Sequence, residues 1–316
     1  MPAEIPVYQD VVKAHDRIRG YVHRTPVLTS ISLNEMFDAS FFFKCENLQK
    51  VGAFKFRGAS NAILSLSDEE KSRGVGTHSS GNHAAALCLA AKMQGIKSYI
   101  VMPRNAPEIK KIAVESYGGI ISFCEPTLEA REKGMDEVVA RTGCTFVPSY
   151  DHPHIVCGQG TAAKELIEDV GELDIVIGPV GGGGLISGTS ISTKGMLPGA
   201  RVIAVEPAGA DDAYRSFKSG KIVPSVNPNT IADGLLTSLG ELNFRVIMKH
   251  VDEIVTVSEE SIIEAMRLLW ERMKIVVEPS GAVPLAGILE KKIETGGKRI
   301  GLILSGGNVD LARLPF

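Results

Sequence analysis

The stretch LDIVIGPVGGGGLISG (residues 173–188) joins an apolar run to four consecutive glycines and then to a segment that begins a candidate helix. The apolar run has the near-continuous hydrophobicity of a strand covered on both faces of a parallel sheet. Glycine costs roughly 0.5 to 1 kcal/mol relative to alanine inside regular structure, so four in succession need a compensating use. Because N–H groups at a helix N-terminus lack partners within the helix, this turn predicts a cradle for a phosphate.

The spacing of these glycines differs from two common nucleotide-binding patterns. The run Gly181, Gly182, Gly183 and Gly184 has neither the G-x-x-x-x-G-K-[ST] spacing of a P-loop nor the G-x-G-x-x-G spacing and distal acid of a dinucleotide fold. The sequence therefore predicts a cofactor that carries one terminal phosphate.

Short β-rich runs alternate with longer segments of helical period along the whole chain. The other predicted strands are residues 41–46, 76–79, 98–103, 120–125, 201–207, 253–258 and 299–305, and helices are predicted at residues 82–94, 129–140, 161–170 and 258–273. Apolar strands separated by helices indicate the α/β class, with parallel sheets flanked by helices. Two sheets fit the length of 316 residues better than one.

Two polar segments predict where the chain crosses between two lobes. They are residues 67–74 and 148–154, and no long linker or low-complexity tract occurs elsewhere. We expect a large discontinuous domain from residues 1–68 and 151–316, and a small domain from residues 74–148.

Composition narrows the class of partner. The net charge is −3, which offers no basic surface for nucleic acid and favours a small-molecule ligand. The five cysteines are an odd number without metal-ligand or redox spacing, which favours reduced thiols and a cytoplasmic location. No signal peptide or apolar run of membrane-spanning length is found in the sequence, so no membrane association is expected.

Two other strand ends carry unusual polar sequence. THSSGNH (residues 77–83) can be an ordinary helix N-cap built on Ser79 or Ser80, or a cradle of free N–H groups for a substrate carboxylate; spacing alone favours neither. In ILSGGNVD (residues 303–310), Ser305 closes a buried strand, where a single serine is usually only a turn residue.

A fourth strand end, VEPAGADD (residues 205–212), is acidic. Acids in a first helical turn commonly complement the helix dipole, and the sequence alone favours that interpretation. The alternative is a hard-cation site, to which Glu206, the carbonyl of Ala210 and Asp212 could supply oxygen ligands for Mg²⁺ or Ca²⁺.

The stretch KVGAFKFRGAS (residues 50–60) sets Lys55 between two phenylalanines. Such a lysine often extends its ammonium group to water along apolar neighbours. Desolvation would instead lower the pKa of its amine and provide the uncharged form that a Schiff base requires. A reactive amine together with a cradle for one phosphate indicates pyridoxal phosphate.

Four motifs in order resemble those of the fold-type II pyridoxal-phosphate enzymes. They are GAFKFRG (52–58), SSGNH (79–83), the tetraglycine run and SGGN (305–308). The chain is similar, from Thr25 to its end, to the group of serine racemases and serine/threonine dehydratases, which includes 3-hydroxyaspartate ammonia-lyases. This resemblance implies a two-lobed fold like that of the tryptophan synthase β subunit, and a homodimer.

The resemblance also implies roles for individual residues. Lys55 would carry the cofactor, Gly181 to Gly184 would hold its phosphate, Asn82 would face its phenolic oxygen, and Ser305 would pair with its pyridine nitrogen. The loop of Ser79, Ser80, Gly81, Asn82 and His83 would receive the substrate carboxylate. His78 and Arg131 are candidates for a second substrate carboxylate, although an exposed helix face explains Arg131 equally well.

The implied reaction is β-elimination from a β-hydroxy amino acid, such as L-serine or 3-hydroxyaspartate, to a keto acid and ammonia. Ser80 occupies the position of a second proton donor, which implies serine racemase activity as well. The positions that match the group's metal site are Glu206, Ala210 and Asp212, for Mg²⁺, Ca²⁺ or Mn²⁺.

Three other functions stay open at this point. The chain could be a dedicated 3-hydroxyaspartate ammonia-lyase with little serine activity. It could be a β-replacement enzyme like the cysteine synthases, although these carry a threonine-rich asparagine loop where this chain has SSGNH. It could also be a pyridoxal-phosphate carrier without turnover, against which Ser80 and the candidate metal site argue.

Overall fold

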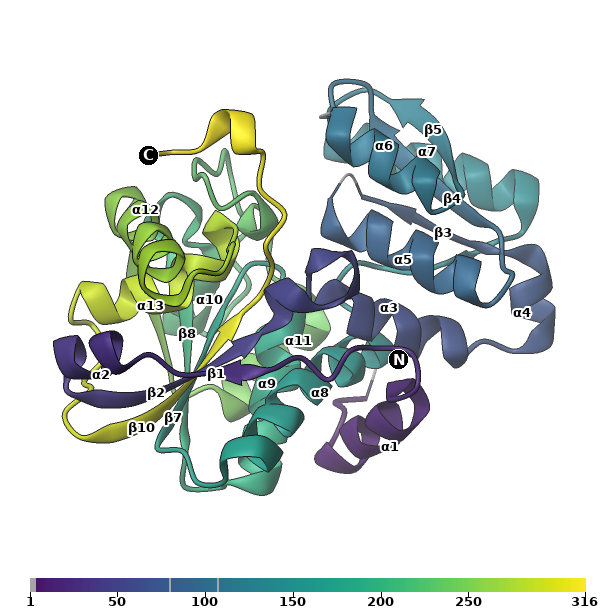
Figure 1. The fold of residues 1–316 in the computed structure, drawn as a ribbon. Coiled ribbons are helices and arrows are strands. Elements are labelled where there is room, and N and C mark those ends of the chain that lie inside the picture. Colours follow the sequence, from purple (N-terminus) through teal and green to yellow (C-terminus); the bar gives the residue numbers. More distant parts are fainter. Residues whose placement is uncertain (1–3, 80, 107) are drawn as a thin grey trace.

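The computed structural model describes residues 4–79, 81–106 and 108–316 of the 316-residue chain. Two sheets, each with helices on both faces, form two lobes (Figure 1). We call the part built on the six-stranded sheet the large lobe, and the part built on the four-stranded sheet the small lobe. The predicted α/β class with parallel sheets is confirmed.

The sheet of the large lobe has the strand order β1-β2-β10-β7-β8-β9. All neighbouring strands are parallel except the pair β1 and β2. The strands span Val27–Leu28 (β1), Ala39–Cys45 (β2), Lys298–Leu304 (β10), Ile175–Pro179 (β7), Arg201–Pro207 (β8) and Glu253–Val257 (β9). Every residue of β7 is buried, as the continuous apolar run predicts for a central strand.

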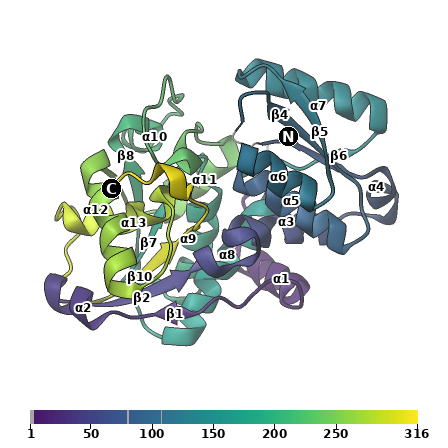
Figure 2. The ribbon, with the colours of Figure 1, turned by 45° about the horizontal axis from the view of Figure 1, so that its top comes forward.

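Helices cover both faces of this sheet (Figures 1 and 2). One face packs against α12 (Glu259–Leu268) and α13 (Pro279–Leu289) in the main hydrophobic core, and α2 (Ile31–Phe37) joins it. The other face packs against α8 (Pro153–Val170), α9 (Gly184–Met196), α10 (Asp212–Ser219) and α11 (Glu241–His250). Helix α1 (Tyr8–Ile18) lies outside α8 and α9.

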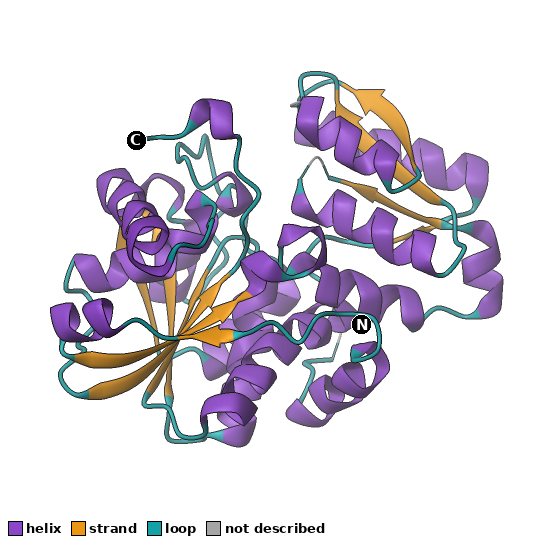
Figure 3. Cartoon of the chain, in the orientation of Figure 1, coloured by secondary structure: helices purple, strands orange, loops and turns teal. Residues whose placement is uncertain are grey.

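The small lobe has four parallel strands in the order β5-β4-β3-β6. These strands span Gly119–Cys124 (β5), Ser98–Pro103 (β4), Val75–His78 (β3) and Thr145–Phe146 (β6). Helices α3 (Lys55–Leu64), α5 (Asn82–Met93) and α6 (Glu108–Ser116) pack in one core with this sheet, and α7 (Leu128–Thr142) covers the opposite face (Figure 3).

Most predicted elements are confirmed within two residues at each end. The predicted helix 161–170 is wrong at its start, because His152 caps a helix that begins at Pro153. The polar segment 67–74 contains a short helix, α4 (Asp68–Arg73), which a capping box of Ser67 and Glu70 begins. The domain boundaries themselves stay a prediction.

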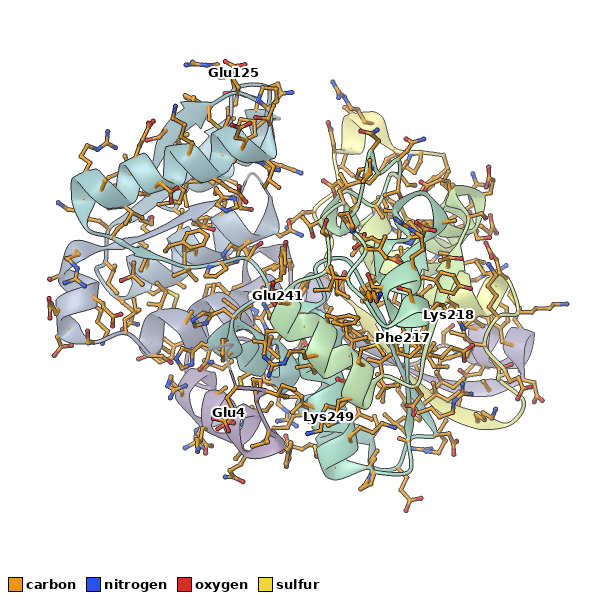
Figure 4. The ribbon with its side chains drawn as sticks, turned by 180° about the vertical axis from the view of Figure 1, so that it is seen from behind. Glu4, Glu125, Phe217, Lys218, Glu241 and Lys249 are labelled. Atoms are coloured by element: carbon orange, nitrogen blue, oxygen red, sulfur yellow. The ribbon has the colours of Figure 1, made fainter. Side chains whose placement is uncertain are left out.

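Charges at helix ends follow the helix dipole where the chain is exposed. In α11, Glu241 lies in the first turn and Lys249 in the last, and both are labelled in the view from behind (Figure 4). An acid near the N-terminus and a base near the C-terminus each interact favourably with the dipole. These side chains therefore have an ordinary structural explanation.

A cluster of fully buried charges ties the start of α3 to the large lobe. Arg57 donates to Glu46 at 2.7 Å and to Glu165 at 2.7 Å, and Lys44 donates to Glu165 at 2.8 Å. Each charge has an opposite partner, which offsets the cost of removing it from water. Because Arg57 lies two residues after Lys55, the cluster fixes the helix that carries the predicted reactive amine.

No helix of the described ranges is long and apolar enough to cross a membrane. All five cysteines are free thiols. Four are buried (Cys45, Cys88, Cys144 and Cys157), and Cys124 is partly exposed.

Helices α8 and α9 approach closely at Gly160 and Gly188. A methyl group on Gly188 would lie 2.4 Å from both the Gly160 nitrogen and the Val156 carbonyl oxygen. We expect Gly188→Ala to lower the free energy of unfolding by about 1 to 3 kcal/mol, because the backbone clash outweighs the better helix propensity of alanine. Urea unfolding measures this loss. Gly199→Ala, where the added methyl meets nothing within 4 Å, is the control, and equal stability of both variants would contradict the packing.

Candidate active site

One pocket between the two lobes is lined by residues from all four sequence motifs. The residues that line it include Lys55, Gly181 to Gly184, Ser305, Ser79, Gly81, Asn82 and His83. The small lobe contributes α5 and α7, and the large lobe contributes the ends of β7 and β10. These carboxyl ends of parallel strands are where α/β folds bind ligands.

Lys55 begins α3 and faces this pocket. The loop that carries it is fixed to the end of β10, because Phe54 N–H donates to the Ser305 carbonyl at 3.0 Å. The Lys55 Nζ donates to the Ser149 carbonyl at 2.8 Å. Burial lowers the pKa of Lys55 to about 8, and the negative charge of Glu278 opposes this shift. Roughly a tenth of the amine is then uncharged at neutral pH, as a nucleophile requires.

The tetraglycine turn leads from β7 into α9 on the same side of the pocket. Gly183 caps α9 with a φ of 90°, a conformation that favours glycine. A methyl group on Gly182 would lie 2.5 Å from the Tyr150 ring, so the turn has no room for a side chain there. A helix N-terminus behind a side-chain-free turn is suited to bind a phosphate, and the residues present fit that group.

Helix α5 follows β3 in the chain, and its first residues, Asn82 and His83, line the pocket. Gly81 caps α5, and open space surrounds the position where its Cβ would lie. His83 is buried, and its Nε2 lies 3.2 Å from the Val147 carbonyl. Burial lowers the pKa of His83 to about 3, with a further contribution from the charge of Lys55. His83 is therefore neutral, and Ser80, the predicted second proton donor, lies outside the described residues.

The two predicted contacts for a second carboxylate also line the pocket. His78 ends β3, and its ring stacks on Phe146 with the ring centroids 5.3 Å apart. Burial lowers the pKa of His78, and the charge of Arg131 lowers it further. Arg131 comes from α7 and faces the pocket instead of lying only on an exposed helix face.

The predicted metal residues lie together outside this pocket. Glu206 and Asp212 are completely buried, and Ala210 is buried as well. The Glu206 carboxylate accepts from the N–H groups of Ala213 and Tyr214 at 3.0 and 2.8 Å. No cluster of three or more histidine, cysteine, aspartate or glutamate side chains in the described ranges is arranged to bind a metal. The predicted set is not a cluster of this kind, because it has two carboxylates and one backbone carbonyl.

Sequence reasoning missed several residues of the pocket wall. They include Lys110, Ser149, Tyr150, Asp233 and Glu278. Lys110 and Asp233 form an ion pair of 2.7 Å between the small and large lobes. The only sequence signal for Glu278 is an acid between an apolar run and a proline, where a helix N-cap would usually be serine, threonine or aspartate.

Comparison with known proteins agrees with this geometry. Residues 18–306 match the family model described as "Pyridoxal-phosphate dependent enzyme". The chain is 52% identical over 312 residues to a β-hydroxyaspartate dehydratase of Paracoccus denitrificans, covering 99% of each chain. It is 49% identical to the L-threo-3-hydroxyaspartate ammonia-lyase of Saccharomyces cerevisiae, covering 98% of this chain and 95% of the relative. The crystal structure of serine racemase from Dictyostelium discoideum superimposes with a TM-score of 0.94 at 49% identity, covering 98% of this chain and all of the other.

A buried amine beside a phosphate cradle, in two α/β lobes, defines the class of pyridoxal-phosphate enzymes. The chain belongs to the pyridoxal-phosphate dependent enzyme family, and it is an enzyme of the kind to which serine racemases and ammonia-lyases belong. The predicted family, fold-type II architecture and enzyme class are thereby confirmed.

The glycine turn gives a test that is separate from turnover. We expect Gly183→Ala to weaken the binding of pyridoxal phosphate about tenfold or more, because a methyl group would meet Leu239 at 2.6 Å and strain a φ of +90°. Equilibrium dialysis against the cofactor measures the affinity. The control is Gly171→Ala, which has a φ of +75° and nothing within 4 Å of the added methyl. Equal affinity of the two variants would contradict the assignment.

Proposed function

We propose that this protein eliminates the β-hydroxyl group of a small amino acid and releases a keto acid and ammonia. The observation that supports this most strongly is the Lys55 amine, with its pKa lowered to about 8, in one pocket with the tetraglycine turn. Relatives that are named β-hydroxyaspartate dehydratase and L-threo-3-hydroxyaspartate ammonia-lyase share about half of its residues.

When bound, pyridoxal phosphate supplies an aldehyde and an electron-withdrawing ring that delocalises the electron pair left at the substrate Cα. The chain's own residues would hold it. Gly181 to Gly184 would bind its phosphate, Lys55 its aldehyde carbon, Asn82 its phenolic oxygen and Ser305 its pyridine nitrogen. A serine hydroxyl does not favour a protonated pyridine as a carboxylate would, so the ring would withdraw electrons weakly. Such a site is suited to prompt loss of the β-hydroxyl.

The substrate amine would displace Lys55 from the aldehyde carbon, and the freed Lys55 amine would then act as the base that removes the α-proton, since it is uncharged at mildly alkaline pH. The β-hydroxyl leaves as water, and a water molecule returns when the unsaturated amine is hydrolysed. The net change is serine to pyruvate and ammonia, or 3-hydroxyaspartate to oxaloacetate and ammonia. The loop of Ser79, Ser80, Gly81, Asn82 and His83 would bind the α-carboxylate.

Return of a proton to the opposite face of Cα would racemise serine instead. Ser80 is our candidate for that proton donor. A relative named serine racemase, from Dictyostelium discoideum, is 48% identical over 317 residues, which supports this second activity. Elimination and racemisation would both use Lys55 as the base that removes the α-proton.

The pocket wall favours a substrate with two carboxylates. Arg131, His78 and Lys110 come from the small lobe, whereas the large lobe contributes Asp233 as the counter-charge of Lys110. Arg131 would bind the second carboxylate of 3-hydroxyaspartate, since arginine pairs with carboxylates through two parallel hydrogen bonds. A dedicated 3-hydroxyaspartate ammonia-lyase is therefore the second candidate.

Substrate comparison with an Arg131 variant tests this proposal. We expect keto acid release from both serine and 3-hydroxyaspartate in the wild type. Arg131→Met should raise the KM for 3-hydroxyaspartate about tenfold and change that for serine less than about twofold, because only the dicarboxylate loses a charge-assisted hydrogen bond. Lys133→Met, on the exposed part of the same helix, is the control.

Three results would contradict the substrate or the reaction that we propose. An equal loss for both substrates would make Arg131 a structural residue. Fast cysteine formation from O-acetylserine and sulfide, without keto acid release, would favour β-replacement. Cofactor binding without any turnover would favour a carrier.

We also propose that Glu206, the Ala210 carbonyl and Asp212 hold a divalent cation, Mg²⁺, Ca²⁺ or Mn²⁺. Burial raises the pKa of Glu206 to about 9, and the negative charge of Asp212 contributes. Burial likewise raises the pKa of Asp212 to about 6. Within the described residues, the buried Asp212 Oδ1 has no hydrogen-bond partner. A hard cation would satisfy this oxygen and stabilise both carboxylates.

The pH dependence of thermal stability tests the cation site. Because the pKa of Glu206 rises from 4.5 to about 9 on folding, its protonated form stabilises the cation-free protein, and this stabilisation is lost as pH increases through that range. The cation competes with the proton, so the rise in Tm caused by Mg²⁺ should be larger at about pH 8.5 than at about pH 6. Glu206→Gln should abolish this rise, and Asp211→Asn, a partly exposed neighbour, should keep it. A pH-independent rise would contradict the site.

A homodimer and a cytoplasmic location complete the proposal. The resemblance to the racemase and dehydratase group supports a homodimer, and the free thiols support a cytoplasmic location. Analytical ultracentrifugation measures the oligomeric state.

A further inference from the structure

Glu278 is a buried acid in a pocket suited to anions. It is 4% exposed and lines the pocket with Lys55 and the tetraglycine turn. It precedes the first residue of α13, but its side chain makes no cap to that helix. A carboxyl group placed here has to be explained by what it contacts.

The Glu278 side chain joins the two lobes. Its Oε1 and Oε2 accept from Asn82 Nδ2 at 3.0 and 3.3 Å, across 196 residues of sequence. Its Oε2 also accepts from the Asn308 backbone N–H at 3.0 Å. A methyl group on Gly306 would lie 2.5 Å from Oε1, so the carboxyl group lies directly against the turn that follows Ser305.

The surrounding donors fix which way the Asn82 amide points. Asn308 Nδ2 donates to Asn82 Oδ1 at 2.9 Å and to the Val51 carbonyl at 2.7 Å. Both amide hydrogens of Asn308 are thereby used, and Asn82 must present its oxygen to Asn308 and its nitrogen to Glu278. This pattern requires Glu278 to accept, which the ionised carboxylate does on both oxygens.

A protonated Glu278 would break the pattern. Its hydroxyl would need an acceptor, and the Asn82 oxygen would supply one if the amide rotates. Rotation would bring the Asn82 nitrogen against the Asn308 amide, which is also a donor. Two donors in contact each lose their hydrogen bond, which is costly for a buried polar group.

Ionisation of Glu278 falls in the neutral range. Burial raises the pKa of Glu278 to about 7, and the charge of Asp233 contributes. Hydrogen bonds from Asn82 and Asn308, and then the charge of Lys110, oppose this shift. Lys55 on α3 is a further charge close to Glu278, because the Glu278 carboxylate raises the pKa of the Lys55 amine.

We propose that Glu278 is a positioning residue whose carboxylate holds the Asn82 amide in one orientation and whose protonation releases it. Its relevance to catalysis rests on the proposed function, in which Asn82 contacts the cofactor. Loss of the carboxylate at acidic pH therefore disorders a cofactor contact and also removes a negative charge near Lys55.

An NMR titration tests this role of Glu278. The ¹⁵N signal of the Asn82 side-chain amide is followed from about pH 5.5 to pH 8.5, in the wild-type enzyme with and without pyridoxal phosphate. We expect its chemical shift to titrate with a midpoint near pH 7 in the cofactor-free protein. Selective assignment uses Asn82→Asp. An Asn82 signal that is constant over this range would overturn the proposal, whatever the activity of the enzyme.

Kinetics with Glu278 variants provide the second readout. Glu278→Gln, which has the same shape and no charge, should lose the Asn82 titration and the acidic limb of the pH profile of kcat, and kcat at the optimum should fall about tenfold or more. Glu278→Asp should keep a titration with a shifted midpoint. Glu290→Gln, at the other end of α13, is the control and should match the wild type.

Different results would contradict the positioning role of Glu278 and the proposed function. A wild-type pH profile in Glu278→Gln would overturn the positioning role, even if keto acid is released normally. Absence of keto acid release from the wild type, with an intact Asn82 titration, would overturn the proposed function and leave the coupling of Glu278 to Asn82 in place.

Discussion

Backbone hydrogen bonds between the loop before α3 and the turn after β10 fix the position on which the whole site depends. Phe54 N–H donates to the Ser305 carbonyl, and Gly307 N–H donates to the Gly52 carbonyl at 2.9 Å. An antiparallel bridge pairs Ala53 with Gly306 between them. Lys55 is thereby held against the carboxyl end of the central strands, where a ligand of the sheet would lie.

Burial then gives this lysine its chemistry. A fully buried ion cluster fixes the first turns of α3 against the large lobe. It consists of Arg57, Glu46, Glu165 and Lys44. The Ser149 carbonyl and the charge of Glu278 favour the ammonium form of the Lys55 amine. Desolvation outweighs both, so the pKa falls to about 8 and an uncharged amine becomes accessible near neutral pH.

The structural features that the sequence predicts are those with local causes. Apolar runs such as residues 175–179 and 298–304 specify buried strands, and glycine in succession specifies a turn with free N–H groups. The two-residue strands β1 and β6 escaped prediction, because only their partners in the sheet make them strands. Glu278 escaped for the same reason: its partner Asn82 is 196 residues away. Motif resemblance, and not spacing, gave Ser305 and Arg131 their predicted roles, and it favoured the cation site at Glu206 and Asp212 that the residues alone offered as an alternative.

The central claim is that Lys55, and no other lysine, carries the cofactor through its amine. Borohydride reduction of the enzyme with bound pyridoxal phosphate fixes the cofactor on the lysine that holds it, and mass spectrometry of the peptides locates the modification. The account predicts one pyridoxyl group on the peptide that contains Lys55. Modification of a different lysine, or of none, would contradict it.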